Sequence, residues 1–271
     1  MGIGKSVSDE QWLGSSDRFG YSWEHFSTLT PEQEEQFIRW TAVLGPDQPW
    51  HGKRFLDVGC GAGRNSYWAM KHGAVSGCAM DIAETSLEAA RRNLAVYPTV
   101  DVVFRSVFSL ESGDYDIVFS IGVIHHLDNP LEAIRCMVKA AKPGGKVLIW
   151  VYGYENMRFM ARVINPLRKL LFSRLPVGLV RWLAFPPAAV LWLLLRLGFG
   201  QVDYLKLLRK FSFIHLHHIV FDQMLPRISN YWRRDEVEAL MLESGLCDIR
   251  LEWVNQVSWS AVGTVPETLP N

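Results

Sequence analysis

The sequence has few cysteines, and none of them stands in a metal-binding pattern. The four, Cys60, Cys78, Cys136 and Cys247, include no CxxC pair and have no histidine at ligand spacing. Structural zinc sites need closely spaced thiolates or imidazoles, and disulfide frameworks belong to oxidising compartments. We therefore expect no metal, and buried thiols in a reducing cytosol.

The sequence also lacks an export signal and repeats. Its first twenty residues, MGIGKSVSDEQWLGSSDRFG, are polar where a secretory signal needs an apolar run, which predicts a protein that is not exported. No segment is of low complexity, and no repeat has solenoid spacing. With 271 residues, 49% of them hydrophobic, the chain can bury one large core.

Net charge is absent as well, but the charges are unevenly distributed. Between Arg158 and Phe211 there are ten basic residues and one acid, Asp203, whereas the rest of the chain holds 18 basic and 27 acidic residues. The neutral total therefore combines an acidic body with a basic, apolar segment.

Short apolar runs alternate with amphipathic segments between Lys53 and Val151, which predicts a parallel sheet with helices on both faces. Expected strands cover residues 54–58, 74–80, 100–104, 115–122 and 146–153. Expected helices cover residues 64–73, 84–98 and 129–145, the last beginning with an Asn cap and Pro and ending at Lys-Pro-Gly-Gly.

After about eighty residues the pattern resumes with a helix at 233–246 and two closely spaced strands at 248–254 and 258–264. The expected fold class is α/β, with a doubly wound, mostly parallel seven-stranded sheet, an antiparallel last strand and a helical cap inserted after the fifth strand. The expected parts are an aromatic N-terminal extension (1–50), a cofactor-binding core (51–152), the apolar basic insertion (153–230) and a C-terminal helix and hairpin that complete the sheet (231–271).

A glycine-rich loop follows the first strand in LDVGCGAGRNS and opens directly into a helix. Glycines allow backbone to approach a ligand at φ values that other residues resist. Asp81 ends the second strand, where a carboxylate can accept both hydroxyls of a ribose. A dinucleotide loop would read GxGxxG, but Arg64 occupies the place of the last glycine, which counts against a nicotinamide-dependent reductase.

The segments LDVGCGAG, MDIAETSLEAARRN, YDIVFSIGVIHHL and KPGGKVLIWVYG, in this order, resemble the class I S-adenosylmethionine-dependent methyltransferases, in particular their small-molecule and lipid-quinone branch. The resemblance covers Lys53 to Tyr152 and the closing helix and hairpin. It implies a Rossmann-like fold with S-adenosyl-L-methionine as cofactor, and methyl transfer as the reaction.

The resemblance also implies roles for individual residues. The loop of Gly59, Cys60, Gly61 and Gly63 would line the methionine part of the cofactor, with Cys60 as filler. Asp57 would order the loop and meet the amino group, Asp81 would hold the ribose, and Ile82 would pack on the adenine.

Further cofactor contacts are expected after the third and fourth strands. Ser106, with Val107 beside it, stands where related enzymes often place an acid that accepts the adenine amine, and this departure weakens that contact. The end of the fourth strand, where cofactor and substrate would meet, holds Ser120, Ile121 and Gly122.

His125 and His126 follow the fourth strand and are candidates for a catalytic base, because neutral imidazole accepts a proton near pH 7. The alternative is that they orient the DNP turn that follows. A second group lies in FIHLHHIVFDQ, where His215 and His218 would share one helix face and Asp222 could orient His218. His215 and His218 are expected to shape the substrate site.

Tyr21, Trp23 and Phe26 form an aromatic cluster ahead of the fold. They are expected either to plug the underside of the sheet or to form a flap over cofactor and substrate.

The uncharged run WLAFPPAAVLWLLL lies within the insertion. Arg181 precedes it and Pro186-Pro187 interrupts it, so we expect two helices rather than one bilayer span. The insertion is expected to be a helical cap, an element at an anionic membrane surface, or both. The second interpretation uses the arginines and lysine at 158, 162, 168, 169, 174, 181 and 196 for headgroups. Long leucine runs argue against nucleic acid.

The sequence thus predicts a cytoplasmic methyltransferase, peripheral at the inner face of a membrane if the insertion binds lipid. Its acceptor would be small and hydrophobic, such as a quinone, polyketide, lipid or lipid-linked glycan intermediate, with oxygen favoured over carbon as the methylated atom. Two alternatives stay open, a non-catalytic membrane-associated partner protein with this fold and, less favoured, the reductase.

Overall fold

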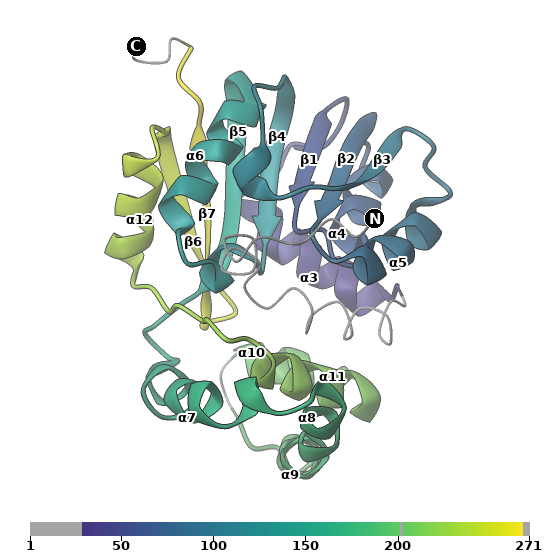
Figure 1. The fold of residues 1–271 in the computed structure, drawn as a ribbon, viewed down its shortest axis with the longest axis vertical. Helices are drawn as coiled ribbons and strands as arrows, with labels where there is room; N and C mark the ends of the chain where they lie inside the picture. The colour runs from purple at the N-terminus through teal and green to yellow at the C-terminus, as the bar shows by residue number, and fades with distance from the viewer. Residues whose placement is uncertain (1–28, 201–202, 268–271) are drawn as a thin grey trace, which may run out of the picture.

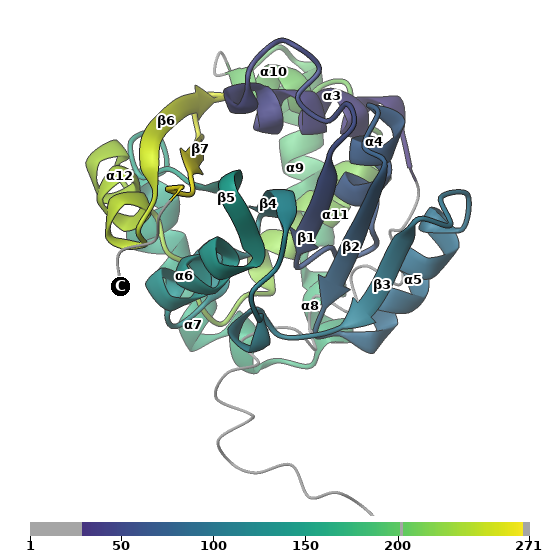
Figure 2. The same ribbon diagram turned by 90° about the horizontal axis from the view of Figure 1, so that it is seen from above.

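A twisted sheet of seven strands forms the centre of the protein (Figure 1). The computed structural model describes residues 29–200 and 203–267. The strands lie in the order β3-β2-β1-β4-β5-β7-β6, as Figure 2 shows from above. Their bounds are β1 Arg54–Val58, β2 Ser76–Asp81, β3 Val100–Phe104, β4 Tyr115–Ile121, β5 Ala141–Tyr152, β6 Cys247–Val254 and β7 Ser258–Thr264.

Strands β1 to β5 pair in parallel, and β7 lies antiparallel between β5 and β6. The order of strands reverses at β1: β2 and β3 are added on one side of it, and β4 and β5 on the other. Loops from both halves of the sheet therefore meet at the carboxyl ends of the parallel strands. The predicted fold class, a mostly parallel seven-stranded sheet with an antiparallel final strand, is confirmed.

Helices cover both faces of the sheet and bury two apolar cores. On one face, α3 (Pro31–Thr41), α4 (Arg64–Lys71) and α5 (Glu84–Leu94) pack through Phe37, Trp68 and Leu87 against the strands. On the other, α6 (Pro130–Ala140) and α12 (Arg234–Glu243) bury residues such as Ile134 and Met241. Strands covered on both sides are apolar on both sides, which explains their uninterrupted hydrophobic runs.

Helix α6 begins as predicted but ends earlier. Asn129 caps it by accepting the backbone N–H of Glu132 at 3.2 Å, with Pro130 at the first helical position. The segment from Lys142 to Gly145, expected as the helix end, belongs instead to β5, whose register against β4 shifts between Tyr115 and Ile117. Gly144 adopts φ 70°, which permits this irregular start of the strand.

The cap consists of short helices between β5 and α12, below the carboxyl ends of the parallel strands in Figure 1. They are a π-helical turn at Met160–Ile164, α7 (Asn165–Leu170), a 3₁₀ turn at Phe172–Arg174, α8 (Val177–Leu183), α9 (Phe185–Arg196), α10 (Asp203–Leu208) and α11 (Phe213–Met224). Helix α11 packs against both α8 and α9 through small apolar clusters around Phe211 and Phe221.

The chain enters and leaves the cap at adjacent positions. Gly153 and Trp232 form a parallel bridge, the N–H of Trp232 donates to the carbonyl of Tyr152 at 3.0 Å, and the N–H of Tyr154 donates to that of Trp232 at 3.0 Å. The two ends of the cap are therefore joined to each other at the edge of the sheet.

The apolar run is divided as predicted into two helices, α8 and α9. Helix α8 ends at Leu183, and Pro186 and Pro187 occupy the first turn of α9, where a proline costs no helical hydrogen bond. The proposed headgroup arginines are not all exposed, because Arg168 is only 1% accessible and points into the protein. The expectation that it faces headgroups is wrong: α7 and the end of α11 enclose it.

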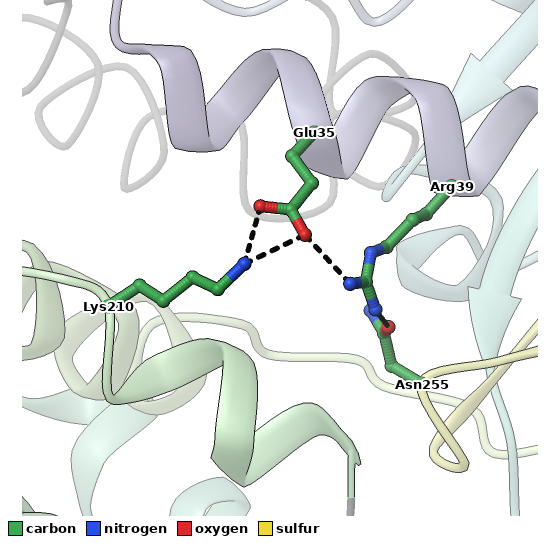
Figure 3. A network of polar contacts seen from close by, with 4 residues as sticks. All are labelled: Glu35, Arg39, Lys210 and Asn255. Carbon is green, nitrogen blue, oxygen red and sulfur yellow. Dashed lines mark hydrogen bonds and ion pairs between the residues drawn. The ribbon is translucent and has the colours of Figure 1, made fainter.

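A polar network joins α3, the cap and the β6–β7 turn (Figure 3). Glu35 accepts from Lys210 at 2.9 Å and from Arg39 at 2.7 Å, and Arg39 also donates to the side chain of Asn255 at 2.9 Å. These partly exposed ion pairs contribute little stability. They do align α3 with the start of α11, so both lie beside the carboxyl edge of the sheet.

Candidate active site

The glycine loop after β1 can be built only with glycine at its key positions. Gly59, Gly61 and Gly63 adopt φ of 78°, 54° and 73°. A Cβ on Gly59 would lie 2.4 Å from the Val123 side chain, and one on Gly63 would lie 3.2 Å from the Ala90 backbone. The loop therefore combines left-handed backbone with close packing against two neighbouring segments.

Asp81 connects the loops that follow β1 and β2. Its Oδ2 accepts the N–H of Gly61 at 2.9 Å, and its Oδ1 accepts those of Ile82 and Ala83 at 2.8 and 3.0 Å. Asp81 thus fixes the turn that leads into α5 and holds the glycine loop. Burial raises its pKa, and the three backbone donors partly offset this effect.

Asp57 lies at the end of β1 and is 1% exposed. Its Oδ2 accepts from the Ser66 hydroxyl at 2.7 Å, whereas its Oδ1 is buried and has no hydrogen-bond partner. Burial, and to a smaller extent the charge of Asp81, raises the pKa of Asp57 to about 7. Two coupled buried carboxylates, one with an oxygen unpartnered, fit a cationic ligand that also offers N–H donors.

The other predicted cofactor residues surround this loop. Cys60 is buried, with its pKa raised well above the usual value by desolvation, which agrees with a filling role. Ile82 is partly exposed beside Asp81. Ser106 caps a 3₁₀ turn by accepting the N–H of Phe108 at 3.3 Å, and Val107 is buried in that turn.

At the end of β4, the Ser120 hydroxyl is buried and donates to the carbonyl of Val58 at 2.9 Å, which ties β4 to β1. Ile121 is 8% exposed. Gly122 adopts φ 82°, and its N–H donates to the carbonyl of Trp150 at 3.2 Å. The backbone here turns away from the sheet and leads into the two histidines.

His125 and His126 form a 3₁₀ turn and are both buried. His126 Nδ1 lies 2.8 Å from the carbonyl of Ile228, which assigns the proton to Nδ1 and leaves Nε2 as the basic nitrogen. Neither ring nitrogen of His125 has a hydrogen-bond partner. Desolvation lowers the pKa of His126 to about 4 and that of His125 well below its usual range, so both rings are neutral at pH 7.

The histidines of α11 approach the glycine loop from the cap. His218 Nε2 lies 2.9 Å from Asp222, one helical turn onward, so the predicted pairing of these two side chains is confirmed. His215 stacks on Phe211 at 4.1 Å, and desolvation followed by the charge of Arg64 lowers its pKa to about 4. Burial lowers the pKa of Arg64 to about 10 against the attraction of Asp222. The first residue of α4 thus faces the cap.

Four further polar residues lie next to His125 and were not expected as site residues: Tyr152, Arg168, Gln223 and Tyr231. They come from β5, α7, α11 and the segment before α12. Tyr152 and Gln223 lie within segments singled out in the sequence, but their side chains were given no role there, and Arg168 and Tyr231 lie outside every such motif. Tyr21, Trp23 and Phe26 lie outside the described residues. Within residues 29–200 and 203–267, no three His, Cys, Asp or Glu side chains gather as a metal site.

Comparison with known proteins places the glycine loop in a family. Residues 56–149 match the family model described as "Methyltransferase domain". Residues 56–149 are thus a methyltransferase domain. S-Adenosyl-L-methionine is the cofactor that this domain implies, and its ammonium group fits the buried carboxyl of Asp57, which has an unpartnered oxygen, while its ribose hydroxyls fit Asp81.

Curated relatives include the ubiquinone biosynthesis O-methyltransferases of Neisseria meningitidis serogroup A, 27% identical over 49% of this chain and 58% of the relative, and of Bordetella bronchiseptica, 37% identical over 42% and 48%. The chain thus spans about half the length of these relatives. Similar solved structures include an O-methyltransferase family protein from Burkholderia thailandensis, with a TM-score of 0.54, 13% identity and coverage of 86% of this chain and 58% of that one. A possible histamine N-methyltransferase from Thermotoga maritima has a TM-score of 0.51 at 12% identity, over 91% and 99%. At these identities the structures establish the fold.

Replacing Asp81 by alanine should abolish tight cofactor binding. The substitution removes the acceptor for three backbone N–H groups and for the ribose, and hydrogen bonds to a charged group contribute about 1.5–3 kcal/mol each. Calorimetry should show at least about a tenfold higher Kd for S-adenosylmethionine. Asp101→Ala, an exposed aspartate on the neighbouring strand β3, is the matched control and should bind normally. An unchanged Kd for Asp81→Ala would refute the assignment.

The raised pKa of Asp57 predicts two opposite pH dependences. Because the carboxyl is held neutral up to about pH 7 in the folded protein but ionises near 3.8 when unfolded, its contribution to the stability of the unliganded protein should fall as pH rises through this window, whereas the buried neutral histidines contribute the opposite slope. Cofactor affinity should instead increase as Asp57 ionises, because the ammonium needs the carboxylate. Calorimetry and urea unfolding between pH 5 and 8 would measure both.

Asp57→Asn separates this carboxyl group from the buried histidines, which titrate in both proteins. The variant should lose the Asp57 part of each pH dependence, so that its stability rises more steeply with pH than that of the wild type, and it should bind the cofactor weakly at every pH. Parallel pH profiles of the variant and the wild type would contradict the role of Asp57.

Proposed function

We propose that the protein is an S-adenosylmethionine-dependent methyltransferase that methylates an oxygen of a small lipophilic acceptor. The observation that carries this proposal is the glycine loop with its two coupled carboxyl groups, the buried Asp57 on β1 and the partly buried Asp81 at the end of β2. The helices of the cap lie at this end of the sheet (Figure 1). The names of its relatives support a quinone-type acceptor. The cap supports a lipophilic one, because its helices bear leucine, tryptophan and phenylalanine.

When bound, S-adenosylmethionine supplies a methyl group on a sulfonium, so the protein has mainly to align the acceptor and exclude water. The buried turn after β4 serves both purposes. His125 is fully buried and neutral, with both ring nitrogens unpartnered, and it is our candidate for the base that takes the proton from an acceptor hydroxyl. His126 is the second candidate, through Nε2.

His215 and His218 are proposed to shape the acceptor site rather than to act on protons. His218 is already paired with Asp222, and His215 is stacked on Phe211. Both lie on the cap helix that faces Arg64 at the entrance of the glycine loop. Ser106 and Val107 are proposed to border the adenine beside Ile82.

A non-catalytic protein of this fold is the rival explanation, and Ser106 in place of an acid is the observation that favours it. Such a protein would bind the cofactor without consuming it. The nicotinamide-dependent reductase is disfavoured by Arg64, which occupies the place of the last glycine in a dinucleotide loop.

Methyl transfer can be detected before the acceptor is known. The protein, incubated with methyl-labelled S-adenosylmethionine and a lipid extract containing quinone and phenol precursors, should release S-adenosylhomocysteine and transfer label to the organic phase. His125→Ala should lower kcat by about 10² to 10⁴-fold, as loss of a general base does, with little change in cofactor Kd. Cofactor binding without product from any extract would favour the rival.

We also propose that the cap lies peripherally on the cytoplasmic face of an anionic membrane. Helices α8 and α9 carry an exposed apolar surface, here called the apolar cap face: Leu179, Trp182, Leu183, Phe185, Val190, Leu193, Leu194 and Leu197. Trp182 is 73% exposed. Basic residues Arg158, Arg162, Arg174 and Arg196 are exposed on the same cap, and an apolar face flanked by such charges is typical of interfacial helices.

Among the described residues, Val177–Arg196 is one stretch long and apolar enough to cross a membrane, with mean hydropathy 1.7 and 17% of it buried. Two features favour an interfacial position over a span. The helix is interrupted at Ala184, and its buried side packs on α11 through Val180, Leu195 and Phe221. Crossing a bilayer would remove α8 and α9 from that packing.

Vesicle flotation tests the membrane proposal. Wild-type protein should float with phosphatidylglycerol vesicles and less with phosphatidylcholine vesicles, and salt should weaken the binding. The double variant Trp182→Ser/Leu193→Ser should lose binding by about tenfold or more, because each removes apolar area from the lipid contact. Leu242→Ser, an exposed leucine on α12, is the control. Equal flotation of all three proteins would contradict the proposal.

A further inference from the structure

A cluster of buried and partly buried polar side chains lies between the cap and the carboxyl ends of β4 and β5. We call it the β5–cap cluster, and it consists of His125, Tyr152, Arg168, Gln223 and Tyr231. These residues come from the turn after β4, the end of β5, α7, α11 and the segment before α12. The strands pair through their backbone groups, so the polar side chains of this cluster are not required for the hydrogen bonding of the sheet. Their presence at this place needs another explanation.

The cluster is continuous. The Tyr152 ring packs on His125 with centroids 3.9 Å apart and stacks on Tyr231 at 5.5 Å. Gln223 Nε2 donates to the Tyr152 hydroxyl at 2.7 Å, and the carbonyl of Gln223 accepts from Arg168 Nη1 at 3.0 Å. The guanidinium also donates to the Asn165 side chain, and burial raises the pKa of Tyr231 with the charge of Arg168 as a partial offset.

Several polar atoms of the cluster are buried without a hydrogen-bond partner. They are both ring nitrogens of His125, Nε of Arg168 and Oε1 of Gln223. Native proteins leave few buried polar atoms unpaired, because each one loses its hydrogen bonds to water. Four in one contiguous cluster indicate a place where a polar ligand supplies the partners.

The charge of the cluster identifies the ligand's sign. Arg168 is 1% exposed, and within residues 29–200 and 203–267 no Asp or Glu forms an ion pair with it. Its two hydrogen-bond acceptors are a backbone carbonyl and an amide, which are both neutral. Buried charges in proteins are ordinarily paired, and the planar guanidinium matches planar oxygen anions.

We infer that the β5–cap cluster binds a planar anionic oxygen group, a carboxylate or phenolate, on the acceptor ring, with Arg168 as the charge partner and Tyr231 as a second donor. This inference rests on the proposed methyl transfer and narrows its substrate class. The acceptor would be an amphiphile with an acidic aromatic head and an apolar remainder along the cap.

The position of the cluster agrees with this role. His125 follows Gly122 by three residues, and the N–H of Gly122 donates to the carbonyl of Trp150, two residues before Tyr152. The anion site and the candidate base thus adjoin the end of β4, where the acceptor would meet the cofactor. If Arg168 binds the acidic group of the acceptor, a second oxygen on the same ring would lie next to His125.

Small ring probes test the inference without knowledge of the acceptor. Benzoate, benzamide and 4-nitrophenolate would be titrated into the full-length protein in the presence of S-adenosylhomocysteine, with binding followed by ligand-detected NMR. Wild-type protein should bind benzoate at least about tenfold more tightly than its neutral isostere benzamide, as expected for a charge-assisted hydrogen bond. Tighter binding of benzoate than of the phenolate would identify a carboxylate, and the reverse order a phenolate.

Arg168→Met should bring the affinities for benzoate and benzamide within about twofold of each other. Arg168→Lys should retain part of the preference, because it keeps the charge but not the planar fork. Tyr231→Phe, which keeps the stacked ring, should reduce the preference by a few-fold. Arg92→Met, an exposed arginine of α5, is the control and should bind as wild type does. Thermal melting would verify that each variant is folded.

Equal binding of benzoate and benzamide to the wild type, or a preference that survives in both Arg168→Met and Tyr231→Phe, would overturn the inference. The proposed function is tested separately by the labelled-methyl assay. Arg168-dependent benzoate binding without methyl transfer would disprove the function and leave the anion site standing. If wild type and Arg168→Lys both methylated neutral acceptors with the same kcat/KM as acidic ones, the proposed function would stand and the anion site would be disproved.

Discussion

The Asp81 carboxylate, with its three backbone N–H donors, is the interaction on which the cofactor half of the protein depends. It joins the loop after β1 to the loop after β2 and fixes the turn that leads into α5. Because all three donors are backbone groups, the loop conformation is set by the main chain and needs glycine where φ is positive. Burial, and to a smaller extent the nearby charge of Asp81, raises the pKa of Asp57. A cationic partner would therefore favour the ionised form of Asp57.

The cap depends on a different principle. Its helices are short, and they bury only small apolar clusters around residues such as Leu208 and Phe221, with much apolar surface left outside. The inner side of the same cap brings Arg168, Gln223 and Tyr231 against β5. The cap thus places polar side chains against the sheet and exposes apolar side chains on α8 and α9. The first set suits the acidic group of an amphiphilic acceptor, and the second suits contact with the lipid in which such an acceptor dissolves.

Most of the sheet could be predicted from the sequence, because its signals are local. Buried parallel strands appear as apolar runs, and Asn129-Pro130 and Pro186-Pro187 mark helix starts wherever the chain lies in space. The segment Lys142 to Gly145 was misassigned because Pro and Gly-Gly usually end a helix, whereas here they form the irregular start of β5. The glycine loop was predictable for the same reason, since strand, loop and helix are consecutive in the chain.

The acceptor side could not be predicted in this way. Tyr152, Arg168, Gln223 and Tyr231 meet only through the packing of the cap on the sheet, and nothing in the flanking residues marks Arg168 as different from the exposed arginines around it. Its burial became visible only in the structure, where α7 and α11 enclose the side chain.

The bridge between Gly153 and Trp232 has a consequence for how such a protein can change. The cap begins and ends at neighbouring positions beside the sheet, so it is a single continuous insertion between two fixed points. Another segment with the same two ends could replace it without moving any strand. Choice of acceptor and use of cofactor can therefore diverge independently, one by exchange of a continuous segment and the other held constant by the carboxylates of β1 and β2.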